Sequence, residues 1–337
     1  MNGDPSSSLL EILDVTQNKY FKDKYIEESF DLSDVIFICT SNDSSQIPAA
    51  LKDRLELIYI NGYTELEKID IAKKYLIPKI SYEHGISNLK ISDDKISDII
   101  KYYTKEAGLR ELERQISKIA RKVVTDGEFN NKIKTNISSL EKYLGKKIYF
   151  QNEKIDEIGV CNALAYTNYG GDILPIEVNY YKGSGKLIVT GQLGDVMKES
   201  SKIALSYIKS NYELFKIDYS KLVDNDIHIN VPDIATKKEG PSAGVALVTA
   251  VISALTDFKI NNKVAMTGEI TLRGKIYQVG GIKEKSIGAY KNGIEKMFIP
   301  YDNVLDLEDV PKEIKEKVEF IPVKKYDEIF NYLKKEV

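Results

Sequence analysis

Hydrophobic residues in the middle of the first half of the chain have the spacing of amphipathic helices. Three segments place apolar side chains three or four positions apart, with charged residues on the opposite face: 64–80, 93–108 and 109–127. A further short helix is expected near 138–144, and the chain becomes polar and irregular between about 145 and 155. The pattern predicts an all-helical unit over 63–147 with a domain boundary after it.

The residues before this unit combine helix and strand patterns. Residues 4–15 predict a helix that begins close to a proline. The run VIFICTSN at 35–42 is apolar and rich in β-branched residues, and it predicts a buried strand. A helix over 49–56 and a strand over 57–62 are expected next. Residues 1–62 therefore have the pattern of an α/β unit.

Beyond the boundary, short strand patterns alternate with helical ones. Strands are predicted at 159–167, 173–181, 186–194, 226–232, 263–270, 296–300 and 319–323. Helices are predicted at 196–212, after Ser242, at 282–292, over most of 304–318 and at 325–335. This alternation of strands and helices predicts a mixed fold for residues 148–337.

Composition narrows the class of protein. The chain has 337 residues, enough for two or three domains, and 42% of them are hydrophobic and 29% charged, as in an ordinary soluble globular protein. A formal net charge of −3 gives no sign of a polyanion binder, and nucleic-acid binding stays open. Cys39 and Cys161 lie far apart, which argues against a disulfide framework or a metal site. The longest apolar run, 244–255, is too short to cross a membrane.

Residues 240–244, GPSAG, match the G-x-S-x-G pattern of a serine nucleophile and precede an apolar run. Ser242 is either a nucleophile or the N-cap of a core helix, because serine caps and first-turn prolines are common. In an α/β-hydrolase the catalytic histidine follows the serine, whereas His84 and His228 both precede Ser242 here. His228 lies in a strand pattern, where a packed or hydrogen-bonded side chain is expected. The order of these residues along the chain excludes the nucleophile elbow of an α/β-hydrolase.

A buried lysine can replace the histidine as the base. Lysine in water has a pKa of about 10.4, and burial lowers it by up to several units, so the neutral amine can accept a serine proton. Residues 266–290 predict a strand, a turn, a second strand, a Gly-Gly pair and a helix, which places Lys283 and Lys285 in one helical turn. Most lysines are solvated surface charges, so the residues alone leave both positions open.

Several stretches together closely resemble the proteolytic domain of the Lon family of ATP-dependent proteases. They are EGPSAG around Ser242, MTGEITLRGK at 266–275, GGIKEK at 280–285, VTGQLGDVMKES at 189–200 and IHINVPDIAT at 227–236. The resemblance covers the second half of the chain. It implies a Ser–Lys dyad with Ser242 as nucleophile and Lys285 as general base, and a hydroxyl at Thr267 that orients the lysine.

Three further positions of this half are supporting candidates or depart from the family pattern. Glu269 is a weaker supporting candidate, with a surface carboxylate as its plain alternative. Glu239 stands where the family usually has aspartate, which bears on regulation more than on chemistry. Tyr166 stands where the family often has tryptophan, so a gating or packing role for an aromatic ring is retained.

The first half resembles the end of the AAA+ ATPase module of the same family. The resemblance implies that Asn42 is at the sensor-1 position, Arg54 at the arginine finger and Arg110 at sensor 2. The plain alternatives are a turn-capping asparagine and arginines that snorkel or pair with nearby carboxylates. ATP and Mg²⁺ are the cofactors implied for the intact protein, and the peptide-bond chemistry requires none.

The sequence contains no G-x-x-x-x-G-K-[ST] phosphate loop and no acidic Walker B run. KGSGKLIV at 182–189 lacks the upstream glycine and has Leu187 where Ser or Thr is required, so we interpret it as a hairpin turn. We therefore expect a chain without ATPase activity of its own, corresponding to the C-terminal portion of a longer protease.

The predicted fold is multidomain α/β and α: a truncated AAA+ α/β core over 1–62, an α-helical lid over 63–147 and an α+β proteolytic domain over 148–337. The resemblance implies an ATP-dependent serine endopeptidase of protein quality control that hydrolyses unfolded or misfolded proteins. A hexamer, no membrane association and a cytoplasmic location, or alternatively the mitochondrial matrix, are expected. The competing hypothesis is a non-catalytic remnant with an intact fold that serves only as an assembly or binding module.

Overall fold

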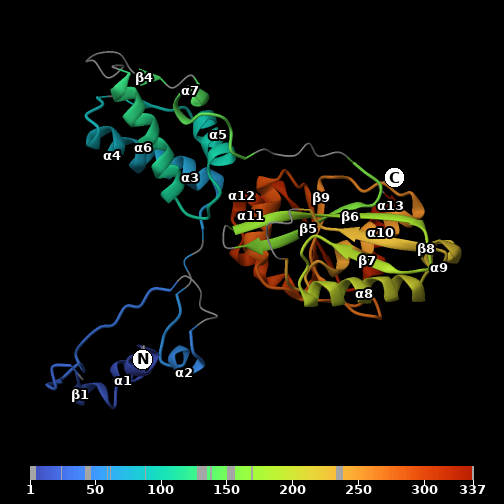
Figure 1. Ribbon diagram of the computed structural model, residues 1–337, viewed down its shortest axis with the longest axis horizontal. Coiled ribbons are helices and arrows are strands. Elements are labelled where there is room, and N and C mark those ends of the chain that lie inside the picture. The colour runs from blue at the N-terminus through green and yellow to red at the C-terminus, as the bar shows by residue number, and fades with distance from the viewer. Residues whose placement is uncertain are drawn as a thin grey trace. The chain divides into compact units, whose positions relative to one another are not determined.

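The computed structural model describes residues 5–23, 25–41, 47–58, 60, 62–87, 89–126, 135–136, 139–149, 156–167, 170–232 and 238–335 (Figure 1). Contacts divide the chain into two compact units, residues 1–61 and 62–337. Within the second unit, one hydrophobic core lies among residues 69–144, and two further cores lie among residues 161–333. These cores are described separately below.

The described residues of the first unit form two short α-helices, one 3₁₀ turn and a small hairpin. Their bounds are α1 Pro5–Leu13, η1 Asn18–Tyr20, β1 Phe21–Lys22, β2 Ser29–Phe30 and α2 Ala49–Lys52. Both strands predicted here are wrong over the residues described. Residues 35–41 form no regular element, with Ile36 and Ile38 each 88% exposed, and Ile58 in the predicted second strand is 81% exposed. A buried strand needs neighbours to pair with, and in the described part of this unit β1 and β2 pair only with each other.

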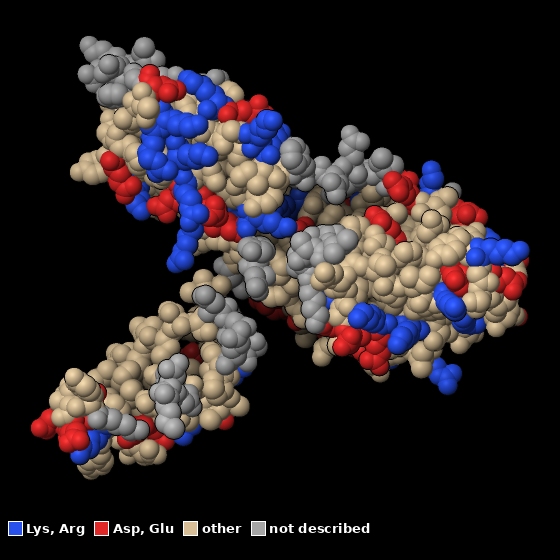
Figure 2. All heavy atoms as spheres, viewed as in Figure 1, with Lys and Arg blue, Asp and Glu red and all other residues tan. Residues whose placement is uncertain are grey.

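The next region is mainly helical, as its pattern predicts. Its elements are α3 Glu65–Ile71, the π-helical turn η3 Ala72–Leu76, α4 Ile77–Glu83, β3 Leu89–Lys90, α5 Asp93–Tyr103, α6 Arg110–Thr125, β4 Thr135–Asn136 and α7 Leu140–Leu144. Thr64 and Glu67 form a capping box that starts α3. The π turn precedes Pro78, whose missing N–H cannot continue a regular α-helical ladder. Figure 2 shows Lys and Arg side chains gathered on the visible face of these helices, with carboxylates between them.

Residues 156–335 are built on a seven-stranded mixed sheet in the order β13-β12-β9-β5-β6-β8-β7. The strands are β5 Val160–Thr167, β6 Gly170–Lys182, β7 Leu187–Thr190, β8 Asn225–Asn230, β9 Val264–Met266, β12 Lys296–Pro300 and β13 Glu319–Val323. Strands β13, β12, β9 and β5 are parallel, and β6 is antiparallel to both β5 and β8. A separate hairpin joins β10 Glu269–Ile270 to β11 Ile276–Tyr277.

Helices cover both faces of this sheet. They are α8 Asp195–Ser210, α9 Tyr219–Val223, α10 Gly244–Thr256, α11 Ile282–Lys291, η4 Tyr301–Asn303, η5 Leu305–Asp309, α12 Lys312–Lys317 and α13 Tyr326–Lys335. Successive strand residues point to opposite faces, so Ala163 and Phe298 join the core with α8, α10 and α13. Their neighbours Leu164 and Met297 join the core with α11 and α12. Helix α10 is buried from Gly244 to Leu255, which places it centrally against the sheet.

Two expectations for this half need correction. The segment 182–189 is not a hairpin, because β6 and β7 both pair with β8, which lies between them. The Asp226 carboxylate accepts hydrogen bonds from the N–H groups of Ser184 (2.8 Å) and Lys186 (2.9 Å) and so holds this loop. The strand predicted over 263–270 is divided, because the chain leaves β9 at Thr267 and enters β10 only at Glu269.

Candidate active site

Ser242 lies in the turn that leads into α10. The helix begins at Gly244, and its N-cap is Ala243, without a side-chain hydrogen bond. The N-cap alternative for Ser242 is therefore wrong: the residue is half-buried and precedes the cap. Gly240, two residues earlier, has φ +109°, a conformation that side-chain-bearing residues rarely adopt. A glycine is thus needed to turn the chain toward the serine.

Lys285 lies in the first turn of α11 and is 3% exposed. Its Nζ donates a hydrogen bond to Thr267 Oγ1 at 3.1 Å. Burial lowers the pKa of this lysine to about 8, and the charge of Glu284 opposes the shift. Lys283, the other lysine of this turn, is only half-buried. Of the two lysines that the sequence left open, the structure brings Lys285 to a hydroxyl.

Thr267 joins the lysine to the serine turn. It follows β9 and is 1% exposed, and its N–H donates to Phe298 O on the neighbouring strand at 3.1 Å. Its Oγ1 donates to the backbone carbonyl of Ser242 at 3.2 Å and accepts from Lys285 Nζ. Gly268 N donates to the same Ser242 carbonyl at 2.8 Å. Within the described residues no hydrogen bond joins Ser242 Oγ to Lys285 Nζ. Thr267 instead links the lysine amine to the backbone carbonyl of Ser242.

The start of α10 also supplies backbone donors. Gly244 N donates to Pro241 O at 3.1 Å and Val245 N to Gly268 O at 3.3 Å. The N–H groups of Ser242 and Ala243 have no hydrogen-bond partner in the described part of the chain. They lie next to the serine hydroxyl along the backbone and before the positive end of a 13-residue helix.

The supporting candidates lie at different distances from this network. Glu239 is exposed, and its Oε1 accepts a hydrogen bond from Val196 N at 3.1 Å in the first turn of α8. Its carboxylate occupies the space that a Cβ atom on Gly194 would need. Glu269, in β10, is half-buried and makes no hydrogen bond to Thr267 or Lys285 among the residues described. Tyr166 is 63% exposed and lies beside Gly281, just before α11.

The histidines have structural partners. His84 Nδ1 lies 3.0 Å from Ile80 O at the end of α4. His228 Nε2 lies 3.0 Å from Thr190 Oγ1 on the neighbouring strand, which confirms a hydrogen-bonded strand histidine. No group of side chains suited to hold a metal ion occurs in the portion of the chain that the structure describes. In the same portion, no helix combines the length and apolar character that a membrane span requires.

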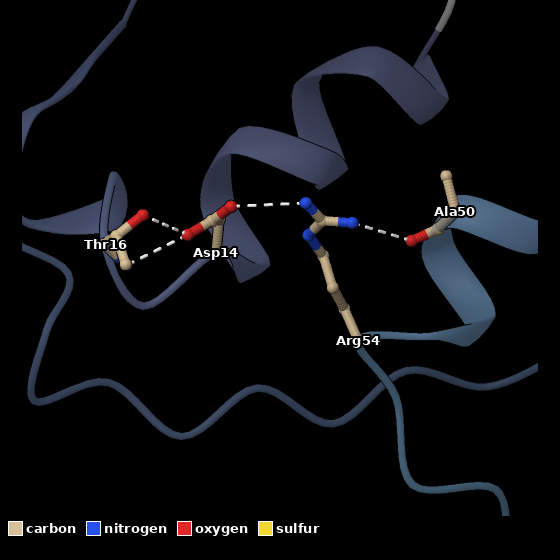
Figure 3. A network of polar contacts seen from close by, with 4 residues as sticks. All are labelled: Asp14, Thr16, Ala50 and Arg54. Atoms are coloured by element: carbon tan, nitrogen blue, oxygen red, sulfur yellow. Dashed lines mark hydrogen bonds and ion pairs between the residues drawn. The ribbon is translucent and has the colours of Figure 1, made fainter.

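The structure describes two of the three residues assigned to the ATPase module, Arg54 and Arg110. Asn42 lies outside the described residues. Arg54 pairs with Asp14 at 3.2 Å and donates to Ala50 O at 2.9 Å, so its guanidinium is held inside its own unit (Figure 3). Hydrogen bonds from Thr16, followed by the one from Arg54, lower the pKa of Asp14. Arg110 is exposed at the first position of α6.

Sequence reasoning missed the contact between α11 and strand β6. Gly171 of β6 and Gly288 of α11 face each other so closely that neither has room for a Cβ atom. The pair Gly170–Gly171 lies between the strands predicted at 159–167 and 173–181, whereas the structure places it inside β6, where glycine often marks the close approach of another backbone.

Comparison with known proteins identifies two matching family models. The model of the Lon protease (S16) C-terminal proteolytic domain matches residues 134–335, and that of the Lon protease AAA+ ATPase lid domain matches residues 82–135. Similar curated proteins include the Lon protease of Mycoplasma mycoides, 49% identical over 98% of this chain, and Lon protease 1 of Bacillus subtilis, 48% identical over 98%. The chain spans 42% and 43% of the lengths of these two relatives.

Proposed function

The chain belongs to the Lon protease family, and we propose that it is a serine endopeptidase in which Ser242 attacks the peptide carbonyl and Lys285 is the general base. One observation carries the proposal. Lys285 is buried, its pKa is lowered to about 8, and its amine lies on the Thr267 hydroxyl, which in turn contacts the serine turn. The same constellation is hard to explain by packing alone, because burying an amine costs free energy.

The proposed proton path starts at the serine hydroxyl. Near pH 8 about half of the Lys285 side chains are neutral and have a free electron pair on Nζ. One of the remaining N–H bonds points to Thr267 Oγ1, which fixes the direction of the amine. Nζ takes the Ser242 proton as Oγ attacks, and it returns a proton to the leaving amine. A water molecule then hydrolyses the acyl-enzyme with the same lysine as base.

The negative charge on the tetrahedral intermediate needs donors. The N–H groups of Gly244 and Val245 already donate hydrogen bonds, whereas those of Ser242 and Ala243 have no acceptor among the described residues. The N–H groups of Ser242 and Ala243 are therefore our candidates. The N-terminus of α10 adds a partial positive charge at the same place. Donors of this kind are typically worth 10²–10³-fold in rate.

Substrates and partners follow from the family rather than from the geometry. We propose that unfolded or misfolded proteins are the substrates and that the intact protein works as a homo-hexamer driven by ATP and Mg²⁺. The match to the lid domain supports the link to an ATPase, whereas this sequence contains no phosphate-binding loop. We place the protein in the cytoplasm, a reducing compartment in which the free thiols of Cys39 and Cys161 would stay reduced.

The deciding experiment compares the chain with its Ser242→Ala variant on an unstructured fluorogenic peptide. Loss of cleavage in the variant supports the dyad, and Ser206→Ala, an exposed serine of α8, is the matched control that retains activity. Equal rates for Ser242→Ala and the unchanged chain reject catalysis by Ser242. A folded chain with no cleavage at all favours the assembly or binding module instead.

A further inference from the structure

Strand β6 and the first turn of α11 approach each other at Gly171. A Cβ atom at this position would lie 1.8 Å from the carbonyl oxygen of Glu284 and 2.9 Å from Lys285 N. The ordinary contact distance begins at 3.4 Å, so any side chain here forces strand and helix apart. Gly171 pairs with Tyr166 of β5, which keeps the strand in register and leaves it little freedom to yield.

The helix side of the contact has the same property. A Cβ on Gly288, one turn after Lys285, would lie 2.4 Å from the carbonyl carbon of Gly171 and 2.6 Å from Asp172 N. At the end of the helix, Asn292 Nδ2 donates to Asp172 Oδ1 at 3.0 Å. Both ends of α11 are therefore seated on the same stretch of β6.

The position of Lys285 depends on this seat. The residue lies between Glu284 and Gly288 on α11, and its side chain reaches Thr267 Oγ1 at 3.1 Å. N–H···O hydrogen bonds usually span about 2.7–3.2 Å, and a separation of about 3.6 Å is no longer one, so an outward shift of α11 by about half an ångström that the side chain does not follow breaks this contact. The same shift admits water to an amine that is now 3% exposed.

We propose that Gly171 is a positioning residue for Lys285: its bare backbone lets α11 seat deeply enough on β6 for the lysine amine to reach Thr267. The proposal rests on the proposed role of Lys285 as base. Gly171 touches no reacting atom and acts only through the placement of α11. Among the charged groups of the described residues, Glu284 is the one that affects the Lys285 pKa in addition to burial, and it belongs to α11 itself.

The test compares Gly171→Ala with Gly183→Ala. The control also has a clash, because a Cβ on Gly183 would lie 2.3 Å from Asp226 Cγ and 2.7 Å from Asp226 N, in the loop that leaves the other end of β6. For Gly171→Ala we expect kcat to fall roughly 10–100-fold with little change in KM, the size that follows from a catalytic group displaced by about 1 Å. The acid limb of the pH–rate profile, set near pH 8 by Lys285, moves to higher pH. Gly183→Ala is expected to lower the thermal stability but to leave the pH of the acid limb unchanged.

A second readout does not depend on cleavage. NMR titration of ¹³C-ε-labelled lysine, with Lys285→Arg to assign the signal, measures the Lys285 pKa directly. A wild-type chain without peptidase activity sinks the proposed function, and the pKa difference between wild type and Gly171→Ala then decides the present inference alone. If Gly171→Ala does not fold, Gly288→Ala presses on β6 from the helix side and is expected to raise the pKa in the same direction. An unchanged Lys285 pKa in the folded variant overturns the inference.

Discussion

Lys68 and Lys285 are buried to nearly the same degree in two regions with different folds. Lys68 lies in α3 of the helical region and is 5% exposed, and Lys285 lies in α11 against the mixed sheet and is 3% exposed. Burial is the main cause that lowers the pKa of each to about 8, and a nearby glutamate opposes the shift in both. By burial and pKa alone, either lysine has the properties of a general base.

Their hydrogen-bond partners separate them. Lys68 Nζ donates to the backbone carbonyl of Glu106 at 2.6 Å, and the Glu106 carboxylate accepts from Leu112 N at 2.8 Å. A carbonyl has no proton to exchange, so this lysine ties the α5–α6 loop to α3. Lys285 contacts a hydroxyl beside a serine that precedes a helix. Burial makes an amine neutral near physiological pH, and the group next to it decides whether that neutrality has a chemical use.

The largest expected effect distinguishes the two lysines by the same substitution. Arginine stays protonated at any working pH and cannot act as a base. Lys285→Arg is therefore expected to reduce kcat for an unstructured peptide by about 10²–10⁴-fold, the usual contribution of general acid–base catalysis. Lys68→Arg should cleave at the rate of the unchanged chain. Steady-state kinetics on both variants, with circular dichroism to verify folding, would contradict the comparison if the two lost activity equally.

A smaller effect is expected at Thr267, the group that gives Lys285 its partner. Thr267→Val preserves the shape of the side chain but removes the acceptor of the Lys285 N–H bond and the donor to Ser242 O. Loss of a hydrogen bond to a charged or partly charged group costs about 1.5–3 kcal/mol, so we expect kcat to fall roughly 10–100-fold.

Thr267→Ser is the matched rescue for this experiment, because it restores the hydroxyl without the methyl group. Its kcat should lie closer to that of the unchanged chain than to that of the valine variant. Equal impairment of the serine and valine variants would mean that volume, rather than the hydroxyl, is what Thr267 contributes.

The sequence predicted the elements of the second half well where each strand has a partner. Residues 296–300 and 319–323 were predicted as strands and are β12 and β13, paired in parallel with each other. The run at 35–41 has an equally strong strand pattern, and it stays exposed and unpaired within the described residues. The hydrophobic pattern of a segment indicates its tendency to form a strand, but whether that strand is paired and buried depends on residues distant in the sequence.

The family resemblance named Ser242, Lys285 and Thr267, but without it the residues alone predict the candidate site only to the level of residue types. GPSAG and the two lysines of the KEK sequence indicate a serine and an amine, but nothing in their spacing distinguishes Lys283 from Lys285. That choice is made by the seating of α11 on β6, which buries one lysine and leaves the other half-buried. The role of Gly171 could not be predicted for the same reason, because more than a hundred residues of chain separate it from α11.

The smallest expected effect is common to both lysines and concerns the free energy of unfolding. The folded protein releases the proton of each lysine near pH 8, whereas the unfolded chain keeps it until about pH 10.5. Between these values the unfolded state binds more protons, so the free energy of unfolding rises with pH, by about 1 kcal/mol per lysine from pH 7 to pH 9. Lys68→Met and Lys285→Met should each remove one such contribution from denaturant unfolding curves, although only the second abolishes cleavage. Measurements should stay below pH 9.5, because the buried hydroxyl of Tyr207, with its pKa raised to about 12, reverses the trend at higher pH. If neither methionine variant changes the slope of the free energy of unfolding against pH, the two amines are solvated in the folded protein. Burial would then not be a property that the two lysines share.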